Sequence, residues 1–359
     1  MERMKRSYKM EQICLKIFQV KAGDCISLRY KGFDEKYHNI FIDCGYSGTF
    51  DKTLDKEIIG LKSRKERIDL FVLTHTHQDH IGGISKFIKK YGEDDIVDQF
   101  WFNGGRLLIN FNISSKISVN QGFELEKYLI KTKKCNTEKI VYKIKEHEIY
   151  GAEIKVIGPT IETLDKFLNT WNKDYSIFSE KITTQMCDWN IDIADFDLDK
   201  FEEDSDEDNK SSIAFIVYIN NTYDKNSKKI LFLGDAFPNQ IAQNLSDMGY
   251  SEENRLNLDY VKISHHGSKG NTSDNLLDII DCSKFIISTN GTNRDKFPHK
   301  ETFARILRHP LRDKNKKIKF IFNYDTVELR SIFKEYEYGD FNFECSYPEK
   351  GDNHNAILI

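Results

Sequence analysis

The sequence has no apolar stretch that approaches the ~20 residues a membrane-spanning helix needs. Residues 1–6 are charged, and no apolar signal-peptide segment follows them. Hydrophobic residues make up 39% of the chain and charged residues 31%, a balance typical of globular proteins in water. We therefore expect a soluble globular protein without a membrane partner.

Paired cysteines are also missing. The seven cysteines are odd in number and scattered, and no two of them form a CxxC motif. This pattern argues against a disulfide framework and against a structural zinc knuckle, and it predicts a cytoplasmic location. The seven are Cys14, Cys25, Cys44, Cys135, Cys187, Cys282 and Cys345.

The net charge is only −4, but it is distributed unevenly. Residues 188–208 contain eleven acidic residues and one lysine, a local charge of −10 that leaves +6 for the rest of the chain. A run of this kind is usually a solvated loop. The alternative is a mobile flap that screens a basic groove from non-specific anions.

Apolar runs of strand length recur along the chain, with helical patterns between some of them. This mixture indicates a layered α/β protein, and a cluster of strands before the first helical pattern favours two packed sheets. The expected strands are 13–20, 26–30, 39–43, 70–73, 140–144, 154–157, 213–219, 230–233, 260–263, 285–288, 318–322 and 327–333. The expected helices are 83–91, 123–132, 161–172, 239–248, 273–280 and 300–308.

The chain has no internal repeat, and 359 residues are enough for one large α/β domain with insertions. Residues 160–210 are rich in aromatic and acidic residues and have weak periodicity. We interpret them as an insertion or acidic loop that covers the domain. The prediction is a single domain over residues 1–359.

The most informative motif is Thr-His-Thr-His-Gln-Asp-His at residues 74–80. It follows the apolar run 68–73, which indicates a buried strand, and α/β proteins place ligand sites at the carboxyl ends of strands. Imidazole and carboxylate are donors that Zn²⁺ and Mn²⁺ prefer, and desolvating four of them without a partner is costly. The motif therefore predicts a metal site. Its four candidate ligands are His75, His77, Asp79 and His80.

Two later strand runs end in similar residues. Residues 229–233 are followed by Gly-Asp, which ends at Asp235, and residues 260–263 are followed by Ser-His-His-Gly-Ser. Asp235 alone is equally consistent with a turn or a helix cap. Adjacent histidines point in different directions, so only one of His265 and His266 need bind a metal. The other is free to support a ligand or contact a substrate.

Together these strings resemble the metallo-β-lactamase superfamily. More narrowly, they resemble the hydrolase domain of competence-type DNA-uptake proteins and its free-standing soluble relatives. Residues 20–25 resemble the opening Gly-Asp segment of that family, and residues 40–45 resemble its strand ending in Asp-x-Gly. Residues 209–213 resemble an Asn-x-x-Ser element before a strand. The resemblance extends from about residue 15 to about residue 310.

The resemblance implies both a fold and a ligand set. The fold is an αββα sandwich of two packed mixed sheets flanked by helices, with the metal site along one edge between the sheets. The implied assignments are one metal on His75 and His77, a second on Asp79, His80 and His266, Asp235 as the bridge between them, and Asp43 as a carboxylate that supports the ligands.

One histidine of the family pattern is missing. Superfamily hydrolases usually supply a further ligand to the first metal from a Gly-His-Thr string, and residues 156–160 contain no histidine. His147 is expected at the surface. Asn209 or water is expected to complete the first site, with a preference for Mn²⁺ or a labile Zn²⁺. The expected cofactor is therefore one or two ions of Zn²⁺ or Mn²⁺.

The donor set implies hydrolysis. A metal ion, or a pair of ions ~4 Å apart, lowers the pKa of bound water so that hydroxide exists near neutral pH. Asp79 is expected to orient that hydroxide, and His299 to donate a proton or contact phosphate. Ser268 and Lys269 are candidates to hold phosphate oxygens, although Lys269 is equally consistent with a solvent-exposed lysine. The histidines expected at the surface are His38, His309 and His354.

Three functions are consistent with these residues. The leading hypothesis is a phosphodiesterase that acts as a nuclease on DNA or RNA, with basic clusters at 62–67 and 308–319 holding phosphates. Such clusters are more often solvated faces. The second hypothesis is a hydrolase of a small phosphoester, cyclic nucleotide, lactone or thioester. The third is a weakly active effector or interaction subunit with protein partners in an operon-encoded system, such as phage defence.

Overall fold

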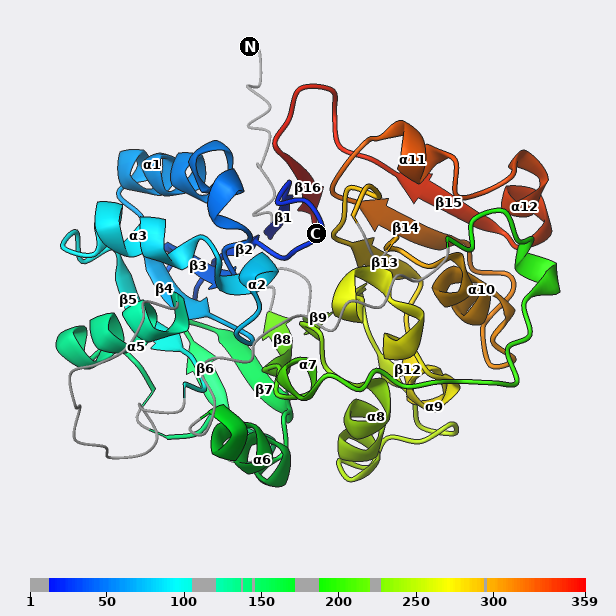
Figure 1. Cartoon of the computed structure of the whole chain (residues 1–359), viewed down its shortest axis with the longest axis horizontal. Coiled ribbons are helices and arrows are strands. Elements are labelled where there is room, and N and C mark those ends of the chain that lie inside the picture. Colours follow the sequence, from blue (N-terminus) through cyan, green and yellow to red (C-terminus); the bar gives the residue numbers. More distant parts are fainter. Residues whose placement is uncertain are drawn as a thin grey trace, which may run out of the picture.

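Figure 1 shows a computed structural model of the chain, in which two large sheets are combined with peripheral helices. Within the described part of the chain, no helix is both long and apolar enough to cross a membrane. The described residues are 13–104, 121–136, 138–143, 146–171, 187–219, 227–293 and 296–359.

The first sheet has six strands. They are β1 (Cys14–Phe18), β2 (Ile26–Lys31), β3 (Tyr37–Ile42), β4 (Ile68–Val72), β5 (Val97–Trp101) and β16 (His354–Leu358). Their order is β16-β1-β2-β3-β4-β5. The pairings from β16 to β3 are antiparallel, and β3, β4 and β5 are parallel to one another. The carboxyl ends of β3 and β4 therefore lie at the same edge of the sheet.

The second sheet has eight strands. They are β6 (His147–Ile149), β7 (Ala152–Gly158), β8 (Ala214–Ile219), β9 (Lys228–Phe232), β11 (Tyr260–Lys262), β13 (Lys284–Ile287), β14 (Ile318–Phe322) and β15 (Phe343–Ser346). Their order is β15-β14-β13-β11-β9-β8-β7-β6, with parallel pairing from β15 to β9. A separate parallel pair joins β10 (Leu256–Asn257) and β12 (Ile280–Asp281).

Helices and short helical turns connect the strands. The α-helices are α1 (Leu54–Arg64), α2 (Gln78–Ile81), α3 (Ile84–Tyr91), α5 (Gln121–Thr132), α6 (Ile161–Trp171), α7 (Glu207–Lys210), α8 (Pro238–Ser246), α9 (Asp274–Ile279), α10 (Lys300–Arg308), α11 (Val327–Arg330) and α12 (Glu335–Asp340). The 3-10 turns are η1 (Ser47–Lys52), η2 (Ile193–Asp195), η3 (Ser264–Gly267) and η4 (Lys269–Asn271).

Three apolar clusters hold four layers together. One cluster lies between the two sheets and includes Leu28 and Leu70 from the first sheet and Phe215 and Ile230 from the second. Another packs α1 and α3 against the outer face of the first sheet. A third packs α8, α9 and α10 against the outer face of the second sheet. This arrangement confirms the predicted αββα sandwich of the α/β class.

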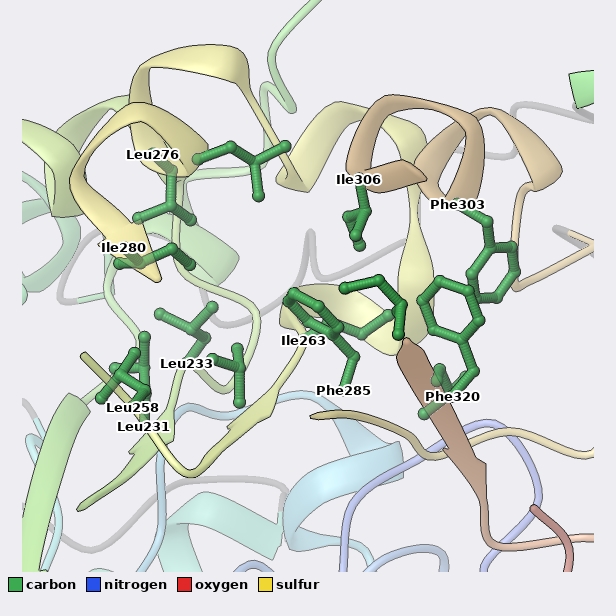
Figure 2. Packing of buried hydrophobic residues seen from close by; sticks show 14 of the residues in the cluster. Leu231, Leu233, Leu258, Ile263, Leu276, Ile280, Phe285, Phe303, Ile306 and Phe320 are labelled. Atoms are coloured by element: carbon green, nitrogen blue, oxygen red, sulfur yellow. The ribbon is translucent and has the colours of Figure 1, made fainter. Parts of the chain in front are cut away.

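Figure 2 shows the packing of helices on the second sheet. Leu276 of α9 and Ile306 of α10 belong to the same buried cluster as Leu231 of β9 and Phe285 of β13. Each of these side chains is nearly inaccessible to solvent. Full burial of such a side chain contributes roughly 1.5–3 kcal/mol, so this cluster holds the strand tips of the second sheet in place.

Two predicted strands are wrong. The segment 327–333 begins with α11, because Thr326 accepts the backbone N–H of Leu329 and so caps a helix. Residues 140–143 form an irregular turn, in which the side chain of Asn103 exchanges two hydrogen bonds with the backbone of Ile140. The apolar residues there are buried without joining a sheet.

The acidic segment 187–210 keeps many exposed residues but is anchored to the helices on the second sheet at several points. Asp188 accepts the N–H groups of Lys300 and Glu301 at the start of α10. Arg308 donates to two carbonyl oxygens of the segment, and Phe196 is buried in the cluster on the second sheet. Figure 1 shows the segment leading from η2 beside α10 to α7 near the middle of the molecule.

Candidate metal centre

The histidine motif follows β4 directly, and its neighbour β3 fixes its backbone. Asp43, which follows β3, accepts both the N–H and the hydroxyl of Thr74 at 2.8 Å. The opening Gly-Asp segment packs against the motif from the other side. A Cβ atom at Gly23 would lie 2.4 Å from the carbonyl oxygen of Asp79, so this close approach requires glycine.

Asp235 lies at the centre of the site, one turn after β9. Gly234 has a φ of +53°, which lets the chain turn sharply and direct the next side chain inward. Asp235 is completely buried, and neither of its carboxylate oxygens has a hydrogen-bond partner. Its Oδ2 lies 3.3 Å from Nε2 of His80 and 3.7 Å from Nε2 of His75.

Fixed partners on the opposite ring nitrogen hold three of the histidines. Nδ1 of His80 lies 2.7 Å from Asp43 Oδ2, and Nδ1 of His266 lies 3.0 Å from the carbonyl oxygen of Ser288. Nδ1 of His75 lies 3.2 Å from the hydroxyl of Ser212. Each contact directs Nε2 toward Asp235. Partners of this kind are typical of metal-binding histidines, whose free nitrogen they orient.

The two adjacent histidines have different surroundings. His266 Nε2 lies 3.1 Å from Asp79 Oδ2 and joins the Asp79–Asp235 group. His265 is held by Asp204 and by Asn271 through Nδ1, with its Nε2 3.8 Å from Asp235. His265 and His266 both have positive φ values, 46° and 54°. Such strain costs about 1–3 kcal/mol per residue and is concentrated at functional sites.

Two groups of ligand atoms share Asp235. The first group is Asp79, His80, Asp235 and His266, and the second is His75, His77 and Asp235. Within each group the ligand atoms lie within 4.8 Å of one another. The structure thus brings the other five predicted metal ligands together around the carboxylate of Asp235.

The donor set fits a cation. His75 Nε2, His80 Nε2 and both oxygens of Asp235 are buried without hydrogen-bond partners, a costly state for polar atoms. Burial lowers the pKa of His80, but Asp235, Asp79 and Asp43 outweigh burial and hold this pKa well above its usual range. The site therefore stabilises positive charge at the point where these donors converge.

The pKa values of Asp235 and His75 are also shifted by burial and by neighbouring groups of the site. Burial opposes a charge on Asp235, but His80, His265 and His266 hold the pKa of this carboxyl well below its usual range. Burial and the neighbouring His80 hold the pKa of His75 well below its ordinary value. A neutral imidazole and an ionised carboxylate are the forms that bind a metal.

Residues 36–104, which include β3, β4 and the histidine motif, match the sequence model of the metallo-beta-lactamase superfamily. The similarity to this superfamily lies in the part of the chain that contains the histidine motif. The chain is also 29% identical over 89 residues to ComE operon protein 3 of Bacillus subtilis. That match covers 24% of this chain and 11% of the Bacillus protein, so the chain spans a small part of that relative's length.

The solved structures to which the chain is similar include metallo-β-lactamases and an RNase Z. A long-form RNase Z from yeast is 11% identical, with 79% of this chain and 38% of that chain covered, at a TM-score of 0.38. A metallo-beta-lactamase from Cronobacter sakazakii is 9% identical, with 63% of each chain covered, at a TM-score of 0.28.

The residues predicted to contact substrate or to support the site differ in their burial and in their contacts. Ser268 is buried, and its backbone joins the turn after His266. Lys269 leaves nearly half of its side chain exposed and lies near Glu301. His299 is buried behind this loop, where its Nδ1 accepts the N–H of Lys269. The side-chain amide of Asn209 donates to Asp204, and its Oδ1 is buried without a hydrogen-bond partner.

Several residues of the site were missed in the sequence. Lys262 forms a buried ion pair with Asp24 at 2.6 Å, and Asp24 Oδ1 lies 3.6 Å from Nδ1 of His266. Asp24 belongs to the Gly-Asp segment that resembles the family, so the sequence did contain a signal that pointed to Asp24. Asp204 and Asp208 reach the site from the acidic segment, and no sequence pattern distinguishes them from their acidic neighbours.

Three histidines expected at the surface have structural roles. His38 is buried between Asp34 and Asp69, at 2.9 and 2.7 Å. His309 is buried and lies 3.1 Å from Asp278. His147 is partly buried, with its ring against Trp101. Apart from Asp34, which is four residues from His38, these partners are distant in sequence, so local sequence does not reveal them.

Proposed function

We propose that this chain is a metal-dependent phosphodiesterase whose substrate is DNA or RNA. The observation that carries the proposal is the shared carboxylate of Asp235, which belongs to two adjacent groups of metal ligands. Two neighbouring divalent ions can hold both the attacking and the leaving oxygen of a displacement at phosphorus. The ions we propose are Zn²⁺ or Mn²⁺, for which imidazole and carboxylate are suitable ligands.

When bound, the ions supply a hydroxide near neutral pH and stabilise negative charge on the phosphate. Asp79 is placed to orient the attacking water, because its carboxylate is held by His266 and still has 19% of its side chain exposed. His80, His266 and His75 are fixed before binding by their Nδ1 contacts. The chain thus holds the reacting groups in position without rearrangement.

His299 is proposed to support the loop that follows His266 as a neutral hydrogen-bond acceptor. Its Nδ1 accepts the N–H of Lys269, so the neutral ring carries its proton on Nε2. Burial and the nearby charge of Lys269 lower the pKa of His299 to about 3. The ring is therefore uncharged near neutral pH, which argues against the general-acid role considered from the sequence.

A second candidate substrate is a small phosphoester, cyclic nucleotide, lactone or thioester. It is favoured because cations of the basic clusters, which were expected to hold a polymeric substrate, are paired with other groups of the protein. Lys62 lies 2.6 Å from Asp94, and Arg67 is paired with Asp98. Arg312 donates to backbone carbonyl oxygens. These cations are already engaged within the protein and are less available to phosphates.

The test is a screen of purified protein with each metal against single- and double-stranded DNA, RNA and bis-p-nitrophenyl phosphate. A nuclease should lose affinity steeply as salt rises, because its substrate releases counterions, whereas a small-substrate enzyme should not. Asp79→Ala and Asp235→Asn should abolish hydrolysis. Asp259→Asn, at a remote carboxylate that accepts the N–H of Lys229, is the matched control.

The screen also tests the remaining hypothesis. Protein that is fully loaded with metal and hydrolyses none of these substrates would contradict the phosphodiesterase proposal and leave a lactone or thioester hydrolase, or an interaction subunit, as the alternatives. The seven cysteines are all free. Free thiols are consistent with a reducing compartment, and a cytoplasmic location is part of the proposal.

A further inference from the structure

The acidic segment reaches the side of the metal centre that lacks the usual histidine. Residues 156–160 contain no histidine, and β7 ends there. At the same side, Nε2 of His77 lies 3.7 Å from Oδ2 of Asp208 and 3.8 Å from Oδ1 of Asp206. His77 therefore belongs to two groups of potential ligands, one with His75 and Asp235 and one with these two aspartates.

We propose that Asp208 replaces the missing histidine and completes the metal site on His75 and His77. This inference rests on the metal-dependent function proposed above. A second observation, independent of where the acidic residues lie, also indicates a metal at this position. His75 Nε2 and both oxygens of Asp235 are buried, unpartnered and directed into the space that the metal would occupy.

The backbone holds Asp208 in register with the histidine motif. Thr76, between the two histidines, donates its hydroxyl to Asp208 Oδ2 at 3.2 Å. Ser212, four residues later, contacts His75 Nδ1, and the N–H of Ile213 donates to the carbonyl oxygen of Thr74. The chain is therefore fixed to the motif at Asp208, within the short helix α7, and again at Ser212 and Ile213 just after it.

Asp206 has a different role. Its Oδ1 accepts the N–H groups of Asp208 and Asn209, so this carboxylate caps α7. Its side chain is 42% exposed, whereas that of Asp208 is 12% exposed. The more buried carboxylate, which is not used as a cap, is the better ligand. Asp206 is therefore a suitable internal control.

An aspartate at this position changes the metal preference. With Asp208, the His77 side has two imidazoles and two carboxylates, in place of the imidazole-rich set of a three-histidine site. Carboxylate oxygen is a hard donor that suits Mn²⁺, whereas added imidazole suits Zn²⁺. Asp208 would also be the third carboxylate of the whole centre, after Asp79 and Asp235, and its negative charge would neutralise more of the charge of two divalent ions. The proposal therefore predicts that this side prefers Mn²⁺.

The test measures bound metal in the intact chain rather than activity. After equilibration with Mn²⁺ and gel filtration, wild-type protein should contain two ions and Asp208→Asn one, with Mn²⁺ affinity at the lost site reduced more than about 10-fold. Asp206→Asn should keep two, because Asn is an equally good helix cap. Asp208→His should restore two ions and shift the preference toward Zn²⁺.

The outcomes separate this inference from the proposed function. Equal Mn²⁺ content in wild type and Asp208→Asn would overturn the assignment of Asp208 and leave the hydrolase proposal intact. A wild-type protein that binds neither Mn²⁺ nor Zn²⁺ would overturn both. Circular dichroism of each variant tests folding, and the Asp208→His result is informative even if Asp208→Asn unfolds, since two ions without altered preference would contradict the proposal.

Discussion

The two sides of the metal centre are built differently. On one side, His80 and His266 are fully buried, and Asp43 and the carbonyl oxygen of Ser288 hold their rings. On the other side, His77 keeps 27% of its side chain exposed and faces the acidic segment. The first side is assembled from strand tips of the two sheets. The second depends on a segment that comes from the far side of α10.

This difference has a thermodynamic consequence. Ligands that are already fixed lose little side-chain entropy when an ion binds, whereas a partly exposed ring must be ordered at that moment. The ion on the His266 side should therefore be held more tightly than the ion on the His77 side. The two ions of the centre are expected to be unequal in affinity and in exchange rate.

The largest expected effect is the loss of one direct ligand from each side. Wild-type protein should release metal to a chelator in two phases. His77→Ala should lack the fast phase, and His266→Ala should lack the slow phase. Supporting residues alone change metal affinity about 10- to 100-fold, so removal of a direct ligand should exceed that range at its own side. The measurement is stopped-flow release monitored with a chromogenic chelator.

The assignment of the weaker ion to the His77 side is wrong if His77→Ala removes the slowly released ion. It also fails if the wild-type protein releases its metal in one phase with two equivalent ions. Asp259→Asn, remote from the site, should release metal as wild type does.

A smaller effect is expected from the residues that hold the rings. Asp43→Asn removes the charge that His80 contacts, and it should weaken the tight ion by ~100-fold. Asn tolerates the φ of +55° at this position. Ser212→Ala removes the contact with His75 Nδ1 and should weaken the exchangeable ion by ~10-fold. Isothermal titration with Mn²⁺ measures both, and equal effects on both ions in either variant would contradict the division into sides.

The sequence was sufficient for the side that strand tips build. Parallel strands are buried on both faces, so β3 and β4 end in apolar runs, at residues 40–42 and 70–73, and polar residues directly after these runs are conspicuous. The motif at 74–80, Asp43 and Asp235 all follow such runs. Their convergence then follows from the shared edge of the sheets. The αββα fold was predictable for the same reason, together with the resemblance to the superfamily.

The side that the acidic segment completes was not predictable. Asp208 is one of eleven acidic residues in 188–208, and only the tertiary contacts with Thr76 and His77 distinguish it. The pairing of β16 with β1 joins the two ends of the described chain, and no local pattern reveals it. The helix α1 was also missed. Its apolar residues are few, and Gly60 interrupts them.

The smallest effect at neutral pH is expected at His299, on the His266 side. Burial and Lys269 lower its pKa to about 3, whereas the unfolded chain should titrate near 6.5. The native state thus resists protonation while the unfolded state accepts a proton. Stability from this group is complete above the unfolded pKa and is lost as pH falls from about 6.5 toward about 3.

His299→Gln should remove that pH dependence. The hydrogen bond to the N–H of Lys269 can be kept by the glutamine oxygen, so the variant should unfold at nearly the wild-type urea concentration at pH 7. At pH 5 the wild type should have lost about 2 kcal/mol of stability that the variant retains. Urea denaturation of the metal-free proteins at both pH values measures this difference. A parallel loss of stability in both proteins would show that His299 is accessible to protons, and would return it to consideration as a proton donor on the tightly built side of the centre.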